Sequence, residues 1–216
     1  MAIINSFPDT DVRSKYKGMV VAIGGPPHSG KSVFLAELYR QLLARRPSGV
    51  FLQRACPDGE GMWSAESDPA VVAEIRRKGA FSQEFMSFVL KGIENLGRRF
   101  SILLLDLGGR KTAENAEILR RSTHVLILSS KDEENEPWSQ FAAAEGCQTL
   151  AILASRLFEL APGVLDTTKR TPDQSWSGEA PLRGELWQLD RKGPPELYRE
   201  AISHIAEWLI AKVESR

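Results

Sequence analysis

Short apolar runs alternate with amphipathic segments along most of this chain. Five runs rich in Val, Ile, Leu and Ala have the length of strands and predict a buried sheet: 19–23, 50–52, 102–106, 125–128 and 148–153. Between and after them, helical spacing of apolar residues and helix-capping signals predict helices at 33–46, 68–79, 82–97, 113–121, 138–145 and from Pro194 onward. A last strand is expected at 182–189. This alternation predicts an α/β fold with a doubly wound, mostly parallel sheet.

The domain organisation follows from length and local composition. A chain of 216 residues lies in the range of one α/β domain, so one core is the simplest expectation. Residues 1–17 are mixed polar and read as an N-terminal tail, and residues 18–216 are expected to form the domain. Residues 161–181 are rich in Thr, Pro, Ser, Gly and Asp, and we expect a lid or a flexible insertion there.

The loop after the first predicted strand carries the most specific motif of the chain. The stretch Gly25-Pro-Pro-His-Ser-Gly-Lys-Ser satisfies the pattern G-x-x-x-x-G-K-[ST] between a predicted strand and a predicted helix. Glycines let the backbone curl, so that amide groups and the positive end of the following helix point at phosphates. Lys31 would reach the β- and γ-phosphates, and Ser32 would hold Mg²⁺. The alternative is a Gly-Pro turn that happens to precede Lys-Ser.

The individual loop residues are assigned as follows. Two consecutive prolines remove two amide donors, so the cradle is expected to depend mainly on the amides of residues 28–32. His28 would lie near the terminal phosphate or would be a bystander on the loop. The candidate nucleotide-binding residues of the loop are Gly25, His28, Ser29, Gly30, Lys31 and Ser32. Residues 18–216 are accordingly expected to form a P-loop NTPase domain.

A second motif closes the buried strand 102–106. Asp106 ends this run and is the candidate that holds Mg²⁺ together with Ser32; the alternative is an ordinary polar strand end. Asp106-Leu-Gly-Gly109 also matches the D-x-x-G pattern of nucleotide switches, in which the Gly109 amide would sense the γ-phosphate. Leu107 stands where AAA-type and RecA-type ATPases have a second acid, which favours the kinase and GTPase branch. No Asn-Lys-x-Asp signature for guanine follows the later strands, so we expect the bound nucleotide to be ATP and not GTP.

Parallel sheets bind ligands at the carboxyl ends of their strands. Charged residues that follow a strand are therefore expected at the ligand edge, and those that precede a strand or end a helix at the opposite edge. Arg98, Arg99, Arg120 and Arg121 belong to the opposite edge. The polar residues expected on the ligand edge are Arg110, Lys111, Ser129, Ser130, Lys131, Ser155, Arg156, Asp190 and Arg191. Arg110, directly after the D-x-x-G motif, joins Gly109 as a candidate nucleotide contact.

Two acids follow the second predicted strand. Asp58 or Glu60 would accept the proton of an acceptor hydroxyl or orient an attacking water, and Trp63 in the same loop would stack on a base. Pro-Asp-Gly is also an ordinary turn sequence, so a plain turn is the alternative.

Charge and cysteine content limit the partners and the compartment. Lys plus Arg equals 28 and Asp plus Glu equals 28, so no net field attracts a polyanion or an anionic membrane. Cys56 and Cys147 lack metal-ligand spacing and do not form a disulfide framework, which fits a reducing, cytoplasmic location. No leader or membrane-spanning run is visible, and no membrane association is expected. Any role of Cys56 beyond packing is left open.

Three segments together carry a resemblance to a known family. Val21 to Ser32, Arg54-Ala-Cys-Pro-Asp-Gly-Glu-Gly and Leu105-Asp-Leu-Gly-Gly-Arg110 resemble the P-loop module, often labelled AAA, of certain CRISPR-associated proteins. The resemblance covers residues 19 to 152. In that family the module is linked to a ring nuclease that degrades the cyclic oligoadenylate messengers of type III CRISPR defence. It therefore implies oligoadenylate as a ligand and a ring nuclease as partner. A nucleotide or short oligonucleotide is the expected acceptor, because Trp63, Arg110 and Lys111 would supply stacking and local charge.

The sequence thus predicts an enzyme that uses Mg²⁺ and ATP to hydrolyse or transfer the γ-phosphoryl group. Lys31, Asp106, Asp58 and Glu60 are its candidate catalytic residues, and Ser32 and Asp106 its candidate metal ligands. A kinase-like protein in type III CRISPR signalling is the first hypothesis. The alternatives are an ATP-binding regulatory switch and an accessory module for a partner ring nuclease, and a homodimer is one assembly we consider.

Overall fold

The computed structural model describes residues 12–56, 83–174, 176 and 178–215. Within them, six strands form a sheet in which every pair of neighbours is parallel. In spatial order the strands are β2 (Val50–Arg54), β3 (Ile102–Asp106), β1 (Met19–Gly24), β4 (His124–Ser129), β5 (Gln148–Arg156) and β8 (Leu182–Trp187).

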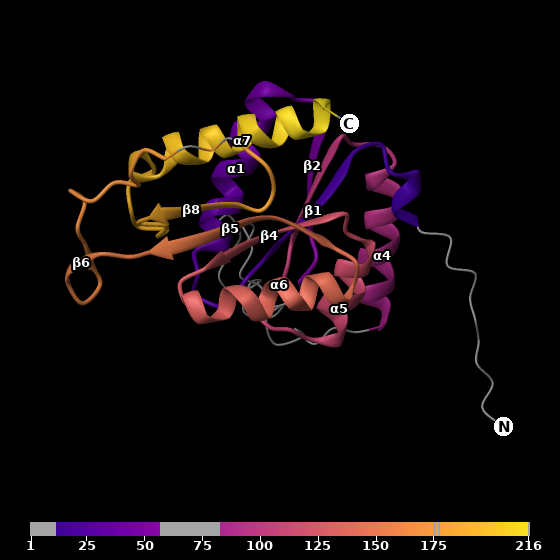
Figure 1. The fold of residues 1–216 in the computed structure, drawn as a ribbon, viewed down its shortest axis with the longest axis horizontal. Coiled ribbons are helices and arrows are strands. Elements are labelled where there is room, and N and C mark those ends of the chain that lie inside the picture. Colours follow the sequence, from indigo (N-terminus) through magenta and orange to yellow (C-terminus); the bar gives the residue numbers. More distant parts are fainter. Residues whose placement is uncertain (1–11, 57–82, 175, 177, 216) are drawn as a thin grey trace.

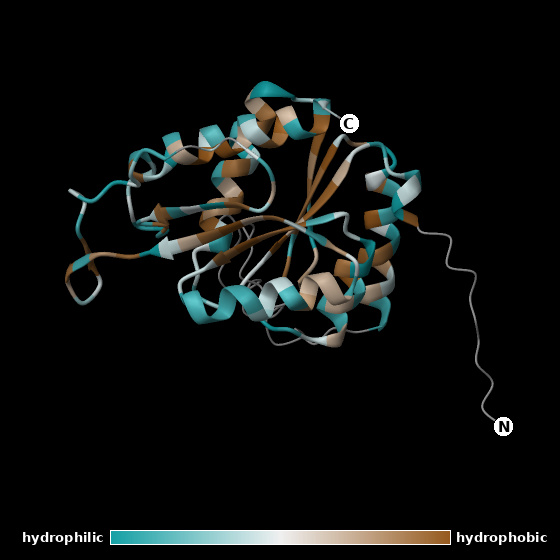
Figure 2. Ribbon diagram, in the orientation of Figure 1, coloured by the Kyte–Doolittle hydropathy of each residue, from teal (hydrophilic) through white to brown (hydrophobic). Residues whose placement is uncertain are grey.

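Helices cover both faces of this sheet (Figure 1). Successive strand residues point to opposite faces. Met19, Val21 and Ile23 therefore pack in a cluster with α1 (Lys31–Arg45) and α7 (Arg199–Glu214), and the intervening residues pack on the other face. The helices of that second face are α4 (Gln83–Gly97), α5 (Ala113–Arg121) and α6 (Asn135–Ala144). Figure 2 shows hydrophobic strands between helices that carry hydrophilic residues on their outer sides.

The predicted fold class is confirmed, and most elements lie where the pattern placed them. The strand 102–106 and the helix 113–121 have the predicted bounds. The fifth strand is longer than expected and continues to Arg156, because it pairs with β8 as far as Trp187. Helix α6 begins at Asn135, after a 3-10 turn, Asp132–Glu134, that the apolar pattern does not reveal. The predicted helix 68–79 lies outside the described residues.

The stretch 171–174, within the segment 161–181, lies along the outer edge of β8. It follows a hairpin of two short strands, β6 (Glu159–Ala161) and β7 (Val164–Leu165). Gln174 accepts a hydrogen bond from Glu185 N at 2.8 Å and donates to Glu185 O at 2.7 Å, and Thr171 Oγ1 accepts from Trp187 N at 2.9 Å. Side chains thus satisfy the edge backbone that would otherwise invite another strand.

The sheet order places a topological switch point at β1. The chain leaves β1 through α1 towards β2 and β3 and later crosses β1 to build β4, β5 and β8 on its other side. In open parallel sheets the crevice at such a reversal is the usual ligand site. Here it lies at the carboxyl end of β1, where the phosphate-loop motif begins.

Two groups buried away from this crevice make stability sensitive to alkaline pH. Burial raises the pKa of Tyr16 from 10.0 to about 12, with Glu94 adding to the shift, and burial raises the pKa of the Cys147 thiol from 9.0 to about 12. Both groups release protons more easily in the unfolded chain. Their contribution to stability is therefore complete below about pH 9 and is lost as pH rises towards 12.

We expect Tyr16→Phe to make this alkaline loss shallower. At pH 7 the variant should be about as stable as the wild type, because the Tyr16 hydroxyl has no hydrogen-bond partner among the described residues. Urea unfolding at several pH values from 7 to about 11 measures both effects. If the stability of Tyr16→Phe falls with pH as steeply as that of the wild type, the Tyr16 hydroxyl is not a source of the alkaline loss.

Candidate functional site

Glycine backbone shapes the loop between β1 and α1. Gly25 has φ of +131°, and a Cβ there would lie 1.9 Å from Leu128 O. Gly30 has φ of +73°, and a Cβ there would lie 2.7 Å from Leu189 Cβ. Both positions therefore require glycine for conformation and for space. His28 also has a positive φ, 59°, and its side chain is exposed.

Polar contacts hold the curled loop in place. The Lys31 ammonium donates to Pro26 O at 2.7 Å, so the lysine side chain folds back across its own loop. Ser29 is buried, and its Oγ accepts a hydrogen bond from Ser130 N at 3.1 Å, which ties the loop to the segment after β4. The Lys31 ammonium and the amino end of α1 thus lie together at the phosphate loop, and this arrangement binds phosphate.

Asp106 and the D-x-x-G segment lie directly beside this loop. Strand β3 neighbours β1 with Asp106 opposite Ile23, and Leu107 N donates to Ile23 O at 3.3 Å. A Cβ on Gly109 would lie 2.8 Å from Pro27 N, so the segment touches the phosphate loop through its backbone.

A cavity of about 1280 Å³ surrounds the loop. Lys31, Ser32 and Asp106 all line it, together with His28, Ser29, Gly30, Gly109 and Arg110. Every candidate nucleotide-binding residue except Gly25 thus borders one space, and Gly25 forms the turn behind it. The volume exceeds that of most small-molecule pockets, so a nucleotide and a second group have room together.

Most of the residues predicted on the ligand edge border this cavity, but Lys111, Ser129 and Lys131 do not line it. Ser130, Ser155, Arg156, Asp190 and Arg191 line the same cavity. Lys111 instead pairs with Glu134 at 2.6 Å. Arg156 also pairs with Asp132 at 2.8 Å and with Glu185 at 3.3 Å, and these contacts raise the pKa of its guanidinium.

Two of the four arginines assigned to the opposite edge, Arg120 and Arg121, form ion pairs. Arg120 pairs with Glu145 at 2.6 Å, and Arg121 pairs with Glu117 at 2.9 Å and with Glu94 at 3.2 Å. These ion pairs join α4, α5 and α6 to one another, away from the phosphate loop.

Oxygen donors for a metal ion are present in the cavity. The Ser32 hydroxyl and the Asp106 carboxylate are ligand types that Mg²⁺ prefers. Among the described residues, no group of three or more His, Cys, Asp or Glu side chains is placed to hold a metal. Two protein ligands fit Mg²⁺, which usually keeps several waters and phosphate oxygens, better than a metal caged by protein alone.

Some site residues were not predicted, and others cannot be placed. Asp58, Glu60 and Trp63 lie outside the described residues. Sequence reasoning missed Asn115 and Phe158, which line the cavity, and Gln188, which is fully buried behind it. Gln188 Nε2 donates to Phe158 O at 3.0 Å and to Asp166 O at 2.6 Å. No motif marks these residues, because their roles depend on contacts between distant segments.

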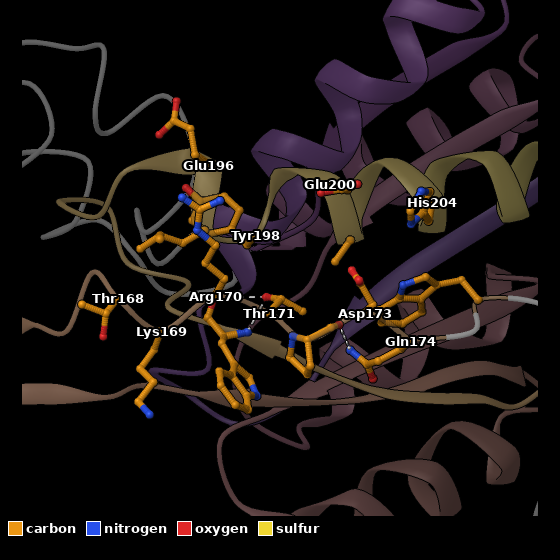
Figure 3. A pocket seen from close by; sticks show the side chains of 15 residues that line it. Thr168, Lys169, Arg170, Thr171, Asp173, Gln174, Glu196, Tyr198, Glu200 and His204 are labelled. Atoms are coloured by element: carbon orange, nitrogen blue, oxygen red, sulfur yellow. Dashed lines mark hydrogen bonds between the residues drawn. The ribbon is translucent and has the colours of Figure 1, made fainter.

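A second cavity, of about 750 Å³, lies between residues 168–176, β8 and the start of α7. Figure 3 shows side chains of both charges around it, including Lys169, Arg170, Asp173 and Glu196. It shares no lining residue with the phosphate-loop cavity. Mixed charge does not select one ligand class, so the phosphate-loop cavity is the candidate site.

A comparison with solved structures supports the fold. No protein-family model matches the chain, and no curated protein matches it by sequence. The structure of pNOB8 ParA bound to nonspecific DNA is similar, with a TM-score of 0.55 at 13% identity over 92% of this chain and 99% of that chain. The fold is that of a P-loop NTPase.

Two further structures are similar at lower scores. The nucleotide-binding protein of Archaeoglobus fulgidus in complex with ADP has a TM-score of 0.48 at 17% identity and covers 93% of this chain and 92% of that chain. An apo GTPase from Pyrococcus abyssi has a TM-score of 0.43 at 14% identity, and the match covers 62% of this chain and 66% of that chain. These descriptions name no CRISPR-associated protein, so that resemblance stays a prediction. None of the helices in the described part of the chain is long and apolar enough to span a membrane.

Proposed function

We propose that this protein binds ATP with Mg²⁺ on the loop Gly25–Ser32 and hydrolyses or transfers the γ-phosphoryl group. The observation that carries the proposal is the meeting of Lys31, Ser32 and Asp106 in one cavity at the switch point of the sheet. A cation, two metal-ligand oxygens and glycine-shaped backbone are the parts that phosphoryl chemistry requires.

Each part has a distinct chemical task. The loop amides and the Lys31 ammonium stabilise negative charge on the terminal phosphate as it is transferred. On binding, the phosphate takes the place of Pro26 O as the partner of the Lys31 ammonium. Ser32 and Asp106 would hold Mg²⁺, which when bound neutralises charge on the phosphate oxygens. Apolar and aromatic surface at Leu157, Phe158 and Leu189 offers a place for the base at the ends of β5 and β8.

We propose a nucleotide or a short oligonucleotide, including oligoadenylate, as the first acceptor class to test. The support is the exposed Arg110 beside Gly109, together with the resemblance to the CRISPR-associated module. In this proposal Asp58 or Glu60 acts on the acceptor hydroxyl, and a ring nuclease in type III CRISPR signalling is the partner class.

The test is a product assay with γ-labelled ATP, Mg²⁺ and a panel of nucleosides, nucleotides and linear or cyclic oligoadenylates. Label on one acceptor would make the protein a kinase and name its substrate class. Label released only as phosphate would make it an ATPase. If ATP does not bind at all, the proposal fails.

A regulatory switch is the second candidate, and the contact between Gly109 and Pro27 favours it. This contact lets a bound γ-phosphate reposition the segment after β3 and thereby alter a surface for a ring nuclease or a second copy of the chain. Slow turnover together with ATP-dependent assembly, measured by light scattering, would favour the switch over the enzyme.

We expect Gly109→Ala to uncouple this segment from the loop. The added methyl group would lie 2.8 to 3.1 Å from three atoms of Pro27, so the two backbones must separate. ADP binding should stay within about threefold of wild type, whereas the difference between ATP and ADP in amide exchange over 106–110 should disappear. Ala113→Ser, at an exposed position nearby, is the control. A retained difference in Gly109→Ala would contradict the coupling.

A further inference from the structure

The phosphate loop divides its cavity into two halves. Strand β3 lies on one side of β1, and β4, β5 and β8 lie on the other. The β3 half is bordered by Cys56, Asp106, Gly108, Arg110 and Asn115. The second half carries the apolar surface proposed above for the base. A nucleotide with its phosphates on the loop and its base in the second half leaves the β3 half free for another group.

A buried carboxamide in the β3 half has an unsatisfied oxygen. Asn115 is 1% exposed, and its Nδ2 donates to Arg110 O at 2.7 Å and to Gly108 O at 3.3 Å. Its Oδ1 is buried and accepts no hydrogen bond from the described residues. The reverse orientation of the amide would place this oxygen against the carbonyl oxygens of Gly108 and Arg110. The neighbours therefore determine that the oxygen, and not the nitrogen, is the atom without a hydrogen bond.

Buried acceptors without a donor are uncommon, because the lost hydrogen bonds to water are not replaced. Helix α5 holds Asn115 in this position, since Thr112 Oγ1 accepts from Asn115 N at 3.3 Å and caps the helix. A donor group on a ligand in this cavity would satisfy the oxygen. The cavity that Asn115 borders is the one that holds Lys31 and Asp106.

We infer that Asn115 Oδ1 accepts a hydrogen bond from the O–H group that attacks the γ-phosphorus. This inference rests on the proposed function and adds a second subsite to it. The attacking group is water in hydrolysis or an acceptor hydroxyl in transfer, and both present the same O–H donor.

The chemical step balances without any further reagent. The O–H oxygen forms a bond to the γ-phosphorus, and the bond between that phosphorus and the β-phosphate oxygen breaks. The nucleoside diphosphate leaves with the bonding electron pair, and the proton of the attacking group passes to the phosphate product or to solvent. A neutral carboxamide is too weak a base to take this proton, so Asn115 orients the nucleophile and does not deprotonate it.

The same side chain links the nucleophile to the γ-phosphate sensor. Its Nδ2 binds the carbonyl groups on both sides of Gly109, and Gly109 contacts the phosphate loop at Pro27. Correct placement of this segment and correct placement of the attacking group therefore depend on one carboxamide.

The test compares affinity for Mg²⁺–ADP with affinity for Mg²⁺–ADP–aluminium fluoride, a mimic of the transferring phosphoryl group with the nucleophile in place. We expect the wild type to bind the fluoride complex at least about tenfold more tightly. Asn115→Ala should lose most of this preference and slow single turnover at least about tenfold, while its Kd for Mg²⁺–ADP stays within about threefold. Ala113→Ser, at an exposed position of the same helix start, leaves both the Thr112 cap and the carboxamide in place, so it should keep the preference.

A second variant separates orientation from tethering. Asn115→Asp keeps an acceptor oxygen but cannot donate to Gly108 O and Arg110 O, and we expect a preference above that of Asn115→Ala. If the variants slow only the hydrolysis of ATP, water is the donor to Asn115. If they slow transfer to an acceptor, the acceptor hydroxyl is the donor. If both variants weaken Mg²⁺–ADP as much as the fluoride complex, Asn115 is only a tether and the inference is overturned.

The wild type distinguishes this failure from a failure of the proposed function. Binding of Mg²⁺–ADP without a preference for the fluoride complex would overturn the inference and leave nucleotide binding intact. Absence of any binding would overturn the proposed function and the inference with it.

Discussion

Lys31→Ala should reduce turnover of γ-labelled ATP at least about 100-fold, the loss typical of removing one preorganised charge-stabilising group. The Lys31 ammonium lies across the phosphate loop, 2.7 Å from Pro26 O, at the mouth where the terminal phosphate would bind. No other cation that lines the cavity belongs to the loop itself. The charge that develops on the transferred group would therefore lose its nearest counter-charge.

The fold should tolerate this substitution well. Lys31 is the first residue of α1, where the helix dipole disfavours a positive charge. Alanine removes this unfavourable term together with the hydrogen bond to Pro26 O, so it should destabilise the fold by no more than about 1 kcal/mol. Lys17→Ala is the matched control, because Lys17 is exposed and precedes β1 at the opposite edge of the sheet. Turnover close to wild type in Lys31→Ala would refute the proposed site.

Asp106→Asn should remove most of the magnesium dependence of nucleotide binding. The substitution keeps the shape of the side chain and replaces a charged oxygen ligand with a neutral amide. We expect apparent Mg²⁺ affinity, measured by titration in the presence of ATP, to fall at least about tenfold, and turnover to fall about 100-fold. Nucleotide binding without Mg²⁺ should be close to wild type, because the loop glycines and Lys31 are intact.

Asp132→Asn is the control for this variant. Asp132 pairs with Arg156 at 2.8 Å near the same edge, and its side chain is 61% exposed, so its charge lies outside the proposed metal shell. Equal Mg²⁺ dependence in Asp106→Asn and wild type would assign Asp106 to the structure of the strand end and not to the metal.

The carboxyl-end rule for parallel strands made much of the candidate edge predictable. Ser155, Arg156, Asp190 and Arg191 carry no motif, yet each follows a predicted strand, and each borders the cavity. Arg120 and Arg121, two of the four arginines placed at the opposite edge, form ion pairs there. The position of a residue before or after a strand was enough to assign it to an edge, because all strands of the six-stranded sheet run in the same direction.

The sequence by itself determined the elements and the phosphate loop. The run Ile102–Asp106 and the helix Ala113–Arg121 have the predicted bounds because their signals are local: an unbroken apolar run in one case, and helical spacing in the other. The glycine-rich loop was predictable for the same reason, since its conformation depends on residues next to one another in the chain.

Only the tertiary structure decided which distant segments meet. The sheet order brings Asp106 beside β1 and places Gly109 against Pro27. It also covers the edge of β8 with Gln174 and Thr171, in a segment whose composition predicted a lid or a flexible insertion. Periodicity records which residues are buried but not which partner buries them, and these contacts join residues far apart in sequence.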